Sequence, residues 1–550
     1  MKDFTKEILA YALDNAIEFG KADASKILPK LFQHGLEKKE ISSTIPLIKE
    51  ITERVNSMEL KERAKEFAKL QKIVKKNEEE KDKDLPEIDV SELKEVVTRI
   101  APEPSKYSHL GHALSFLLNY LYAKKYGGEC LLRFEDTNPE KVSQEYVDAF
   151  LEDLKDYLGI KYDKIKYVSD DMQKLYGYAE ELVKNGHAYI CHCPQEEVRD
   201  NRAKGVECGC RQFPLGIQIL RWKEFLDGKY AEGHAVLRLK GNMQSQNFVM
   251  RDPILFRRLD AKHYRHGTKY KIWPMYDFYN PIEDSLMGVT LILRSNEFDL
   301  RVELQDYIKD LLKLKKQRII QYGRFNVKEF TTKGREIREL IESGNLIGWD
   351  DPRLITLKAL RRRGIAKEAF YELAKQVGLS KHPVNLEFDM IAAINRKILD
   401  KKTMRYFFVD NAVKIEIENA KGLKDIEIPV HPDTPEKTRK VKVADRIFIS
   451  GKDFNDLKGQ EVRLLHLFNL VLNEKTKISS VENKKIPKIQ WVCNGIKVKV
   501  LMPSGEWVDG FAEKAIEKLK VGEVVQFERF GFVRFDRKNK DAYEFWFGHK

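Results

Sequence analysis

The chain has 550 residues, of which 42% are hydrophobic, and its 99 Lys and Arg against 86 Asp and Glu give a formal net charge of +13. This length accommodates about three or four domains, and this hydrophobic content excludes a chain disordered throughout. No stretch reaches the roughly 20 apolar residues of a membrane-spanning helix, no signal-peptide pattern is present, and six cysteines make no disulfide framework. We therefore expect a cytoplasmic protein. The basic charge favours nucleic acid as a partner, although a solvated Lys/Glu-rich surface would give the same composition.

The N-terminal part is predicted to be helical. Residues 1–70 repeat apolar side chains at helical spacing. They are followed by the charged run 72–84, which we interpret as a linker or a solvated helix end. We assign residues 1–85 to a helical region with its linker.

The next part alternates strands and helices. The β-branched run 95–100, the loop 101–111, the helix that follows it and the strand 130–134 form a βαβ unit. Such a unit predicts a parallel sheet with its ligands at the carboxyl ends of the strands. Residues 289–294 and 317–323 read as later strands of the same sheet.

The remaining boundaries follow from changes in pattern. The α/β part spans 90–330, and the stretch 188–287 interrupts it as an insertion. Residues 331–405 are again helical, and 406–550 read as short strands separated by turns. The predicted order is helical, α/β with an insertion, helical, and all-β.

The loop after the first strand carries a candidate nucleotide site. It lacks the common glycine-rich phosphate motifs but has His109 and His112 on either side of Gly111, where a helix begins. A helix N-terminus favours phosphate, glycine permits close approach to the backbone, and the imidazoles could donate to phosphate oxygens as charge develops. Alternatively, His109 caps the loop and His112 is an ordinary helix residue.

Four segments resemble one enzyme family. P-E-P-S-K-Y-S-H-L-G-H (102–112) resembles the H-I-G-H signature of class I aminoacyl-tRNA synthetases, with Leu110 in place of isoleucine. The segments 132–141, 273–284 and 348–365 resemble the glutamyl and glutaminyl subfamily. The all-β C-terminal part is similar to that of the archaeal type of glutamyl-tRNA synthetase.

This resemblance implies the fold and the reaction. The fold would be a Rossmann-like catalytic domain with an acceptor-end-binding insertion, a helical connective subdomain and β-barrel anticodon-binding domains. The function would be that of a glutamate–tRNA ligase, which uses ATP and Mg²⁺ to activate L-glutamate and charge tRNA-Glu. The resemblance also implies that activation needs bound tRNA. It leaves open whether tRNA-Gln is charged as well, and we expect a monomer with no membrane partner.

The second class I signature, K-M-S-K-S, is poorly matched. Its best candidate is F-T-T-K-G-R (330–335), which puts Lys333 at the second lysine, with Arg335 as a possible helper. Lys333 would supply charge to the leaving pyrophosphate. The alternative is a lysine on a surface loop.

The resemblance also implies the amino-acid pocket. A carboxylate suits the α-ammonium of the substrate, and Glu135 would supply it; a guanidinium suits a glutamate side chain, and Arg294 would supply it. Glutaminyl enzymes have a small uncharged residue at the position of Arg294, so glutamate is favoured as the substrate. Two departures, Ser285 after Asp284 and S-N-E-F after Arg294, put contacts to ATP or the acceptor end in doubt. The implied pocket residues are Arg99, Glu103, Glu135, Tyr276, Asn280 and Arg294.

Two rival functions remain. A glutaminyl-tRNA synthetase is opposed by Arg294. A non-catalytic tRNA-binding scaffold subunit is permitted by the poor second signature, but an intact H-L-G-H and a complete amino-acid pocket argue against it. Basic segments at 313–318 and 361–363 would suit tRNA, or a solvated face.

The insertion contains a cysteine cluster. Cys191, Cys193, Cys208 and Cys210 form two C-x-C pairs separated by fourteen residues, which suits a structural Zn²⁺ with four thiolates and no open position. His192 is a less favoured ligand. The alternative is four reduced thiols without metal. Family relatives sometimes carry zinc in this insertion.

Overall fold

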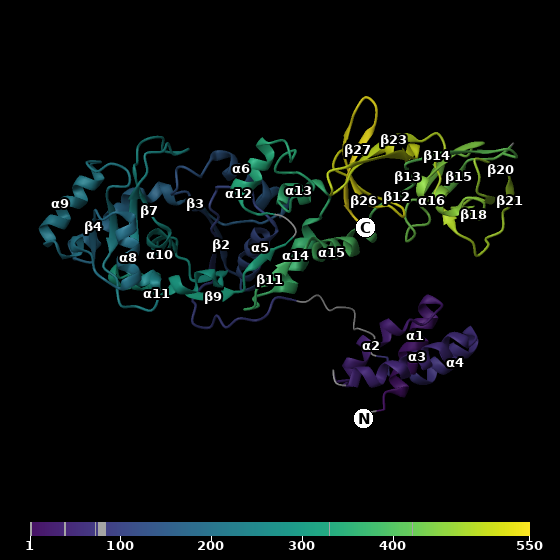
Figure 1. The fold of residues 1–550 in the computed structure, drawn as a ribbon, viewed down its shortest axis with the longest axis horizontal. Coiled ribbons are helices and arrows are strands. Elements are labelled where there is room, and N and C mark those ends of the chain that lie inside the picture. The colour runs from purple at the N-terminus through teal and green to yellow at the C-terminus, as the bar shows by residue number, and fades with distance from the viewer. Residues whose placement is uncertain (1–2, 38–39, 72, 75–83, 329–330, 421) are drawn as a thin grey trace. The chain divides into compact units, whose positions relative to one another are not determined.

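The computed structural model describes residues 3–37, 40–71, 73–74, 84–328, 331–420 and 422–550. The chain forms two compact units, Met1–Asp84 and Leu85–Lys550, and each is described by itself (Figure 1). Most of the charged run predicted at 72–84 lies outside the described residues. None of the helices in the described part is both long and apolar enough to span a bilayer.

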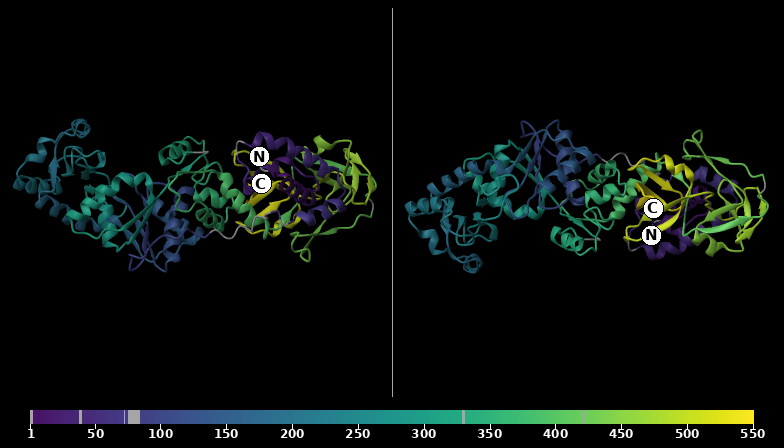
Figure 2. Two further views of the ribbon diagram at one scale, coloured as in Figure 1. Left: turned by 90° about the horizontal axis from the view of Figure 1, so that it is seen from below. Right: turned by 90° about the horizontal axis from the view of Figure 1, so that it is seen from above.

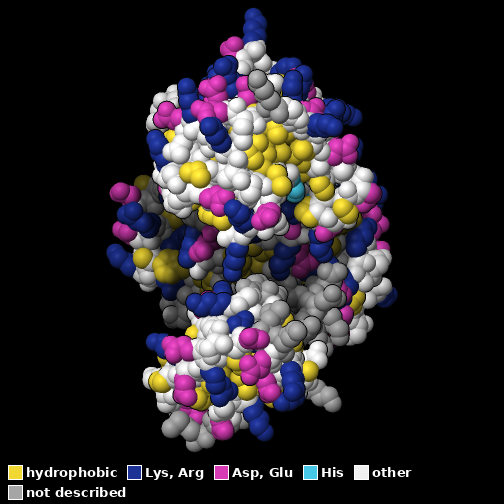
Figure 3. All heavy atoms as spheres, turned by 90° about the vertical axis from the view of Figure 1, so that its right-hand side faces the viewer, with side chains coloured by type: hydrophobic (Ala, Val, Ile, Leu, Met, Phe, Trp, Pro, Cys, Tyr) yellow, Lys and Arg dark blue, Asp and Glu magenta, His cyan; other side chains and the backbone are white. Residues whose placement is uncertain are grey.

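The first unit is helical, as predicted. Its helices bury one apolar stripe each, including Ile8, Leu13, Ile48 and Val55, in a common core. On the face visible in Figure 3, its Lys, Arg, Asp and Glu side chains are interspersed rather than separated by sign. The helices are α1 (Thr5–Phe19), α2 (Ala24–Leu31), α3 (Ile41–Ser57) and α4 (Leu60–Leu70).

The second unit is built around a parallel sheet. Strands β1, β2 and β3 pair in parallel, as do β8 and β9, and a hydrogen bond from Thr290 N to Val97 O (3.0 Å) joins the two sets. The strands predicted at 95–100, 130–134, 289–294 and 317–323 are therefore confirmed. The strands are β1 (Val97–Ile100), β2 (Glu129–Phe134), β3 (Ile165–Tyr167), β8 (Leu291–Ser295) and β9 (Arg318–Tyr322).

Helices connect these strands and cover the sheet. The crossover helix α5 links β1 to β2, and its buried residues Leu110, Leu114 and Leu117 share a core with Leu132 and Phe134 of β2. This core fixes the start of α5 at the carboxyl end of β1. The helices are α5 (Leu110–Lys125), α6 (Gln144–Glu152), α7 (Met172–Lys184), α10 (Tyr276–Leu286) and α11 (Asp299–Leu311).

The insertion forms its own antiparallel sheet in the order β4-β5-β6-β7. Its helices α8 and α9 lie at the end of the second unit that is far from the all-β part, in every view (Figures 1 and 2). Trp222 and Phe225 of α9 pack into the core of this sheet. The elements are β4 (Ala188–Cys191), α8 (Gln195–Lys204), α9 (Leu215–Leu226), β5 (Val236–Leu239), β6 (Ile254–Arg258) and β7 (Ile272–Pro274).

A helical segment joins the sheet to the C-terminal part. Strands β10 and β11 pair in parallel and bracket the first helices of this segment. The elements are β10 (Phe325–Val327), α12 (Gly334–Glu342), α13 (Leu357–Arg362), α14 (Lys367–Val377), β11 (Val384–Leu386) and α15 (Phe388–Asp400).

The C-terminal part is all-β apart from one short helix, as predicted. Its largest sheet has the order β12-β25-β26-β27-β23-β24-β13, and Figure 3 shows a group of hydrophobic side chains on one face of this part. The elements are β12 (Arg405–Tyr406), β13 (Phe408–Asp410), β14 (Val413–Ile417), β15 (Ile426–Pro429), β16 (Thr438–Val441), β17 (Arg446–Ile449), α16 (Gly451–Leu457), β18 (Glu461–Leu464), β19 (Asn469–Val471), β20 (Lys475–Thr476), β21 (Ile478–Ser480), β22 (Lys488–Ile489), β23 (Ile496–Leu501), β24 (Trp507–Ala512), β25 (Val524–Phe527), β26 (Gly531–Lys538) and β27 (Tyr543–His549).

One strand-like run behaves differently. I-Q-W-V-C (489–493) contributes only the end of β22 and an isolated bridge at Val492. Trp491 is fully buried, and its Nε1 donates to Leu465 O, so this segment is held by packing of its side chain more than by a ladder.

The arginines 361–363 join the helical segment to other parts of the unit instead of forming a basic face. Arg363 is buried and donates to the carbonyl oxygens of Phe547, Gly548 and Pro352. Arg362 pairs with an aspartate of β26, Asp536, and Arg361 with Glu152. The run therefore holds the all-β part against the helical and α/β parts.

Candidate active site

A cavity of about 490 Å³ lies at the carboxyl ends of β1, β2 and β8, where the βαβ pattern predicts ligand binding. Two predicted site residues do not line it: Asn280 is buried beside Glu135, and Lys333 is exposed. The predicted site residues that line the cavity are Arg99, Glu103, His109, Gly111, His112, Glu135, Tyr276 and Arg294.

One side of the cavity is backed by a buried network of charges. Asp284 Oδ1 accepts from Arg99 Nε (3.0 Å) and Arg133 Nη1 (2.7 Å). Arg133 Nη2 also donates to Glu135 Oε1 (3.0 Å), which in addition accepts from Asn280 Nδ2 (3.2 Å). The network therefore fixes the orientation of Arg99 and Glu135 before any ligand binds.

Two carboxyl groups of this network respond differently to their surroundings. Burial alone would raise the pKa of Asp284, but the charges of Arg133 and Arg99 lower it overall. Burial raises the pKa of Glu135, and Arg133 offsets this only in part. A cation from a ligand would complete the pairing of Glu135, because Arg133 divides its charge between two carboxylates.

Arg294, the last residue but one of β8, has two nitrogens without a hydrogen-bond partner in the part of the chain that the structure describes. Its Nη1 donates to Gln305 Oε1 at 2.8 Å. The side chain is 5% exposed and lines the cavity, yet Nε and Nη2 have no hydrogen-bond partner among the described residues. Buried guanidinium groups are normally satisfied, so these donors point to an anionic ligand.

Tyr276 and Asn280 lie one turn apart on α10, as their spacing predicts, but only Tyr276 lines the cavity. Burial raises the pKa of Tyr276 to about 12, so its hydroxyl is protonated at neutral pH. Asn280 acts behind the cavity wall through its hydrogen bond to Glu135.

His109 and His112 form the start of α5. His109 Nδ1 accepts from Gly111 N (3.1 Å), His112 Nδ1 accepts from His109 N (3.2 Å), and the rings stack with centroids 3.8 Å apart. Burial lowers the pKa of His109 to about 3 and that of His112 well below its usual value, and the charge of Lys106 adds to both shifts. Both rings are therefore neutral, and because Nδ1 accepts, Nε2 carries the hydrogen.

The histidine pair caps the helix, as the alternative interpretation has it, and also lines the cavity. His109 does cap the helix, and its Nε2–H is nevertheless left as a donor on the cavity side. Gly111 gives this arrangement room, since a Cβ there would lie 3.1 Å from Cε1 of His109, closer than an ordinary van der Waals contact.

The first backbone N–H groups at the start of α5 already donate hydrogen bonds within the protein. Leu110 N donates to Ile355 O (3.1 Å), and the amides of His109 and Gly111 donate to the two imidazoles. The bond to Ile355 O and a second one, in which Leu357 N donates to Ser108 O (2.9 Å), connect the segment 348–365 to the loop that precedes α5. A ligand at this end of the cavity would therefore meet side chains more than backbone N–H groups, in contrast to the helix-terminus site that the sequence indicated.

The two lysines near the histidines differ in position. Lys333 is 77% exposed and its Nζ pairs with Glu336 Oε1 at 2.7 Å, while Phe330 of the same motif lies outside the described residues. Lys106, which the sequence analysis did not single out, lines the cavity with His109 and His112. The sequence could have indicated Lys106, because it lies three residues before His109 in the same loop.

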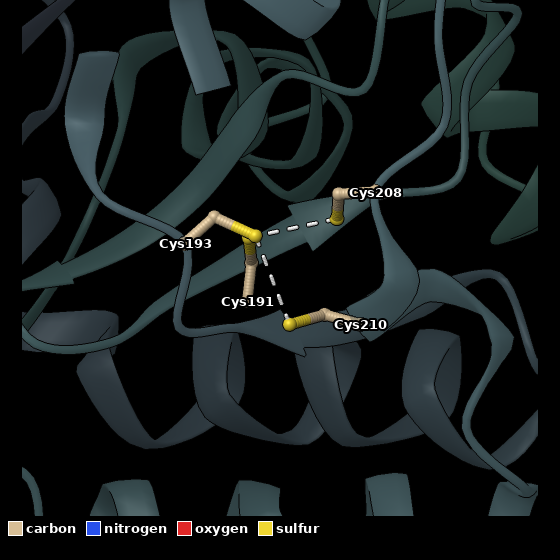
Figure 4. A group of neighbouring side chains, drawn as sticks. All are labelled: Cys191, Cys193, Cys208 and Cys210. Carbon is tan, nitrogen blue, oxygen red and sulfur yellow. Dashed lines mark hydrogen bonds between the residues drawn. The ribbon is translucent and has the colours of Figure 1, made fainter. Parts of the chain in front are cut away.

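The four cysteines of the insertion converge. Their sulfur atoms all lie within 4.8 Å of one another, with Cys191 Sγ and Cys208 Sγ 3.8 Å apart and Cys193 Sγ and Cys210 Sγ 4.0 Å apart (Figure 4). Zinc bound tetrahedrally at about 2.3 Å from each sulfur would need sulfurs about 3.8 Å apart. Beside them, the buried Arg238 Nη1 lies 3.7 Å from both Cys191 Sγ and Cys208 Sγ. The donor set fits Zn²⁺.

Family models match most of the chain. Residues 95–401 match the catalytic domain of the class I tRNA synthetases (E and Q). Residues 403–491 and 484–536 match two models of the anticodon-binding domain of the same class.

Relatives match over the full length. The glutamate–tRNA ligase of Pyrococcus furiosus is 39% identical over 572 residues, covering 99% of both chains. That of Methanocaldococcus jannaschii is 36% identical over 561 residues, covering 99% of this chain and 100% of the relative. Among solved structures, the glutamate–tRNA synthetase of Elizabethkingia anophelis is 18% identical with a TM-score of 0.39, covering 56% of this chain and 71% of that one.

Proposed function

We infer that this chain, which belongs to the class I tRNA synthetases for glutamate and glutamine, is a glutamate–tRNA ligase. The observation that carries the choice of glutamate is Arg294, which lines the cavity and whose buried Nε and Nη2 lack hydrogen-bond partners among the described residues. A carboxylate satisfies both donors and the charge together, whereas the amide of glutamine would leave a buried charge unpaired.

The amino acid would bind between the groups that the buried network orients. Glu135 takes the α-ammonium, and Arg294 takes the side-chain carboxylate, with Arg99 at the same wall. The protonated hydroxyl of Tyr276 is a donor for a further carboxylate oxygen. We propose Glu103, which also lines the cavity, as a second acidic contact.

ATP enters as its magnesium complex, and Mg²⁺ supplies charge neutralisation on the phosphates. The neutral rings of His109 and His112 donate from Nε2–H to phosphate oxygens, and Gly111 lets the nucleotide approach the helix start. These groups hold charge as it develops and transfer no proton. Lys333 remains a proposed contact to the leaving pyrophosphate, although its present partner is Glu336.

The reaction then has two steps. The α-carboxylate of glutamate attacks the α-phosphorus of ATP and releases pyrophosphate, which leaves glutamyl-adenylate. A ribose hydroxyl at the 3′ end of tRNA-Glu then attacks the acyl carbon and releases AMP. The protein positions the two substrates and stabilises the charge that develops in the reaction. It does so with side chains whose orientation is already fixed before any ligand binds.

We assign tRNA contacts by domain. The all-β part, which matches the anticodon-binding models, would read the anticodon, and the insertion 188–287 would hold the acceptor end. We propose that the protein works as a monomer in the cytoplasm, with residues 90–330 as its catalytic domain and 331–405 as the connective segment.

We further propose that Cys191, Cys193, Cys208 and Cys210 hold a structural zinc ion. Metal analysis of the purified protein should give about one zinc per chain, and the Cys208→Ser variant should lose it. A chain free of zinc that keeps the same thermal stability would contradict this proposal.

The deciding experiment is aminoacylation of total tRNA with radiolabelled glutamate and glutamine in parallel. We expect charging with glutamate alone. The His112→Ala variant should lose charging while binding tRNA as before, which separates an enzyme from a tRNA-binding scaffold. Charging with glutamine would contradict the role of Arg294, and charging with neither, with tRNA still bound, would favour the scaffold.

A further inference from the structure

The lysine that the second signature offers to the leaving group, Lys333, does not line the cavity. Lys333 is exposed and already paired with Glu336, and the motif around it lacks the first lysine and the serine of the family pattern. The pyrophosphate gains negative charge as it leaves, so some cation at the histidine end of the cavity should meet it.

Lys106 is the only lysine that lines the cavity among the described residues. It lies in the loop between β1 and α5, three residues before His109, and it is partly buried. The other cations of the lining are Arg99 and Arg294, at the amino-acid end, and Arg324, which pairs with Glu297 at 3.0 Å.

Among the residues that the structure describes, the ammonium group of Lys106 has no ion-pair partner. Its Nζ donates to the carbonyl oxygen of Thr332 at 3.1 Å, and within the described part of the chain no carboxylate forms an ion pair with it. Burial lowers the pKa of Lys106, while the neighbouring Glu103 raises it. A partly buried cation held by a single carbonyl lowers its energy when an anion binds beside it.

Thr332 and Gly334 both contact Lys106. The first residue of α12, Gly334, packs against its stem, since a Cβ on Gly334 would lie 3.1 Å from Cβ of Lys106. Thr332 and Gly334 belong to the degenerate second signature, so this motif positions Lys106 from one side. The charge of Lys106 also contributes to keeping His109 and His112 neutral, which places the three groups close together.

We propose that Lys106 is a catalytic residue of the activation step, which contacts the β- and γ-phosphates of ATP and supplies the cation that the second signature lacks. This inference rests on the proposed ligase function. A carboxylate oxygen of glutamate forms a bond to the α-phosphorus as the bond to the bridging oxygen breaks. The electron pair of the broken bond stays on that oxygen, which leaves with pyrophosphate, and Lys106 Nζ–H donates to it without transferring its proton.

The test uses the Lys106→Gln variant, which can still donate to Thr332 O but carries no charge. With tRNA-Glu present, we expect kcat/KM for ATP in pyrophosphate exchange to fall about 10²- to 10³-fold, with KM for glutamate changed less than threefold. The Lys106→Arg variant should recover part of the loss. Lys174→Gln, which removes an exposed lysine of α7 that pairs with Asp171, is the matched control.

A structural role is excluded by comparing two inhibitors. Pyrophosphate should inhibit Lys106→Gln at least tenfold more weakly than the unmodified protein, whereas adenosine, which has no phosphate, should inhibit both equally. Equal weakening of both inhibitors, or a loss below threefold for ATP, would overturn the proposal, as would a larger loss in Lys333→Gln. Binding of pyrophosphate and adenosine can be measured by calorimetry, so the inference stays testable even if glutamate charging fails.

Discussion

The two ends of the cavity are built in opposite ways. At the amino-acid end, Arg99, Arg133, Asp284 and Glu135 are buried and paired with one another before any ligand binds. At the end where we propose that phosphate binds, two neutral imidazoles and the ammonium of Lys106 line the cavity, and no carboxylate of the described residues pairs with that ammonium. The first arrangement fixes a shape that distinguishes one amino acid from another. The second leaves charge uncompensated until a phosphate arrives, which suits a group that must bind a transition state more tightly than a substrate.

The largest expected effect comes from breaking the pairing at the amino-acid end with Asp284→Asn. Among the described residues, Arg99 would then have no ion-pair partner and Arg133 would keep only Glu135, so the free energy of unfolding should fall by roughly 3–5 kcal/mol. Glutamate charging should fall about 10²-fold because Arg99 loses its orientation. Chemical denaturation and the charging assay measure the two losses.

The control is Asp310→Asn, which removes an exposed carboxylate paired with Lys316. It should change stability by about 0.5 kcal/mol or less. If Asp284→Asn denatures and charges glutamate like this control, the buried network does not organise the amino-acid end.

A smaller effect is expected from Gln305→Glu, which makes the partner of Arg294 charged. Gln305 is 1% exposed, and its neutral carbonyl oxygen holds Nη1 of Arg294 without cancelling its charge. A carboxylate there would form an ion pair, so kcat/KM for glutamate should fall about 10- to 100-fold and its ratio to that for glutamine should shrink. Steady-state kinetics with both amino acids gives the ratio.

The matched variant is Gln305→Met, which removes the acceptor but adds no charge. It should raise KM for glutamate while keeping most of the preference over glutamine. A preference lost equally in both variants would mean that position, and not charge, is what Gln305 provides to Arg294.

The smallest effect concerns the support of the phosphate end. Ser108, just before His109, donates from Oγ to Asp153 Oδ2, and burial raises the pKa of Asp153 from 3.8 to about 7. The folded chain thus keeps a proton that the unfolded chain releases above about pH 4, so the free energy of unfolding falls as pH rises from about 4 to 7. The Asp153→Asn variant should lack this contribution, which we expect to be roughly 1–2 kcal/mol between pH 5 and 7.

Urea denaturation of both proteins at pH 5 and pH 7 measures this difference. Glu513, whose pKa burial also raises to about 7, titrates in both proteins and cancels. Parallel changes with pH in the two proteins would show that Asp153 does not bind its proton in this range.

Local patterns along the chain predicted much of the fold. Helical periodicity, the βαβ unit and the strand-like C-terminal runs each arise from neighbouring residues, so they were visible without tertiary information. The run 489–493 was the exception, because packing of Trp491 replaced most of its expected ladder.

The sequence predicted several of the residues that line the candidate site, but it did not predict which other residues they pair with. The motif residues Arg99, His109 and Arg294 do line one cavity. Lys333 and the arginines 361–363 also carried charge in suggestive positions, yet the first pairs with Glu336 and Arg363 is buried against carbonyl oxygens. Charge type is a property of one residue, whereas its partner depends on what the fold brings beside it.

The sequence by itself determined the order of the helical, α/β and all-β parts and predicted which residue types stand at the candidate site, because these depend on residue type and short spacing. Only the tertiary structure decided three features of the site. Asp284 accepts a hydrogen bond from Arg133, which is 151 residues away in the sequence, and Ile355 O accepts from the amide of Leu110. Lys106 lines the cavity. Contacts between distant segments follow from how helices and sheets bury their apolar faces together, and that packing is a property of the whole chain.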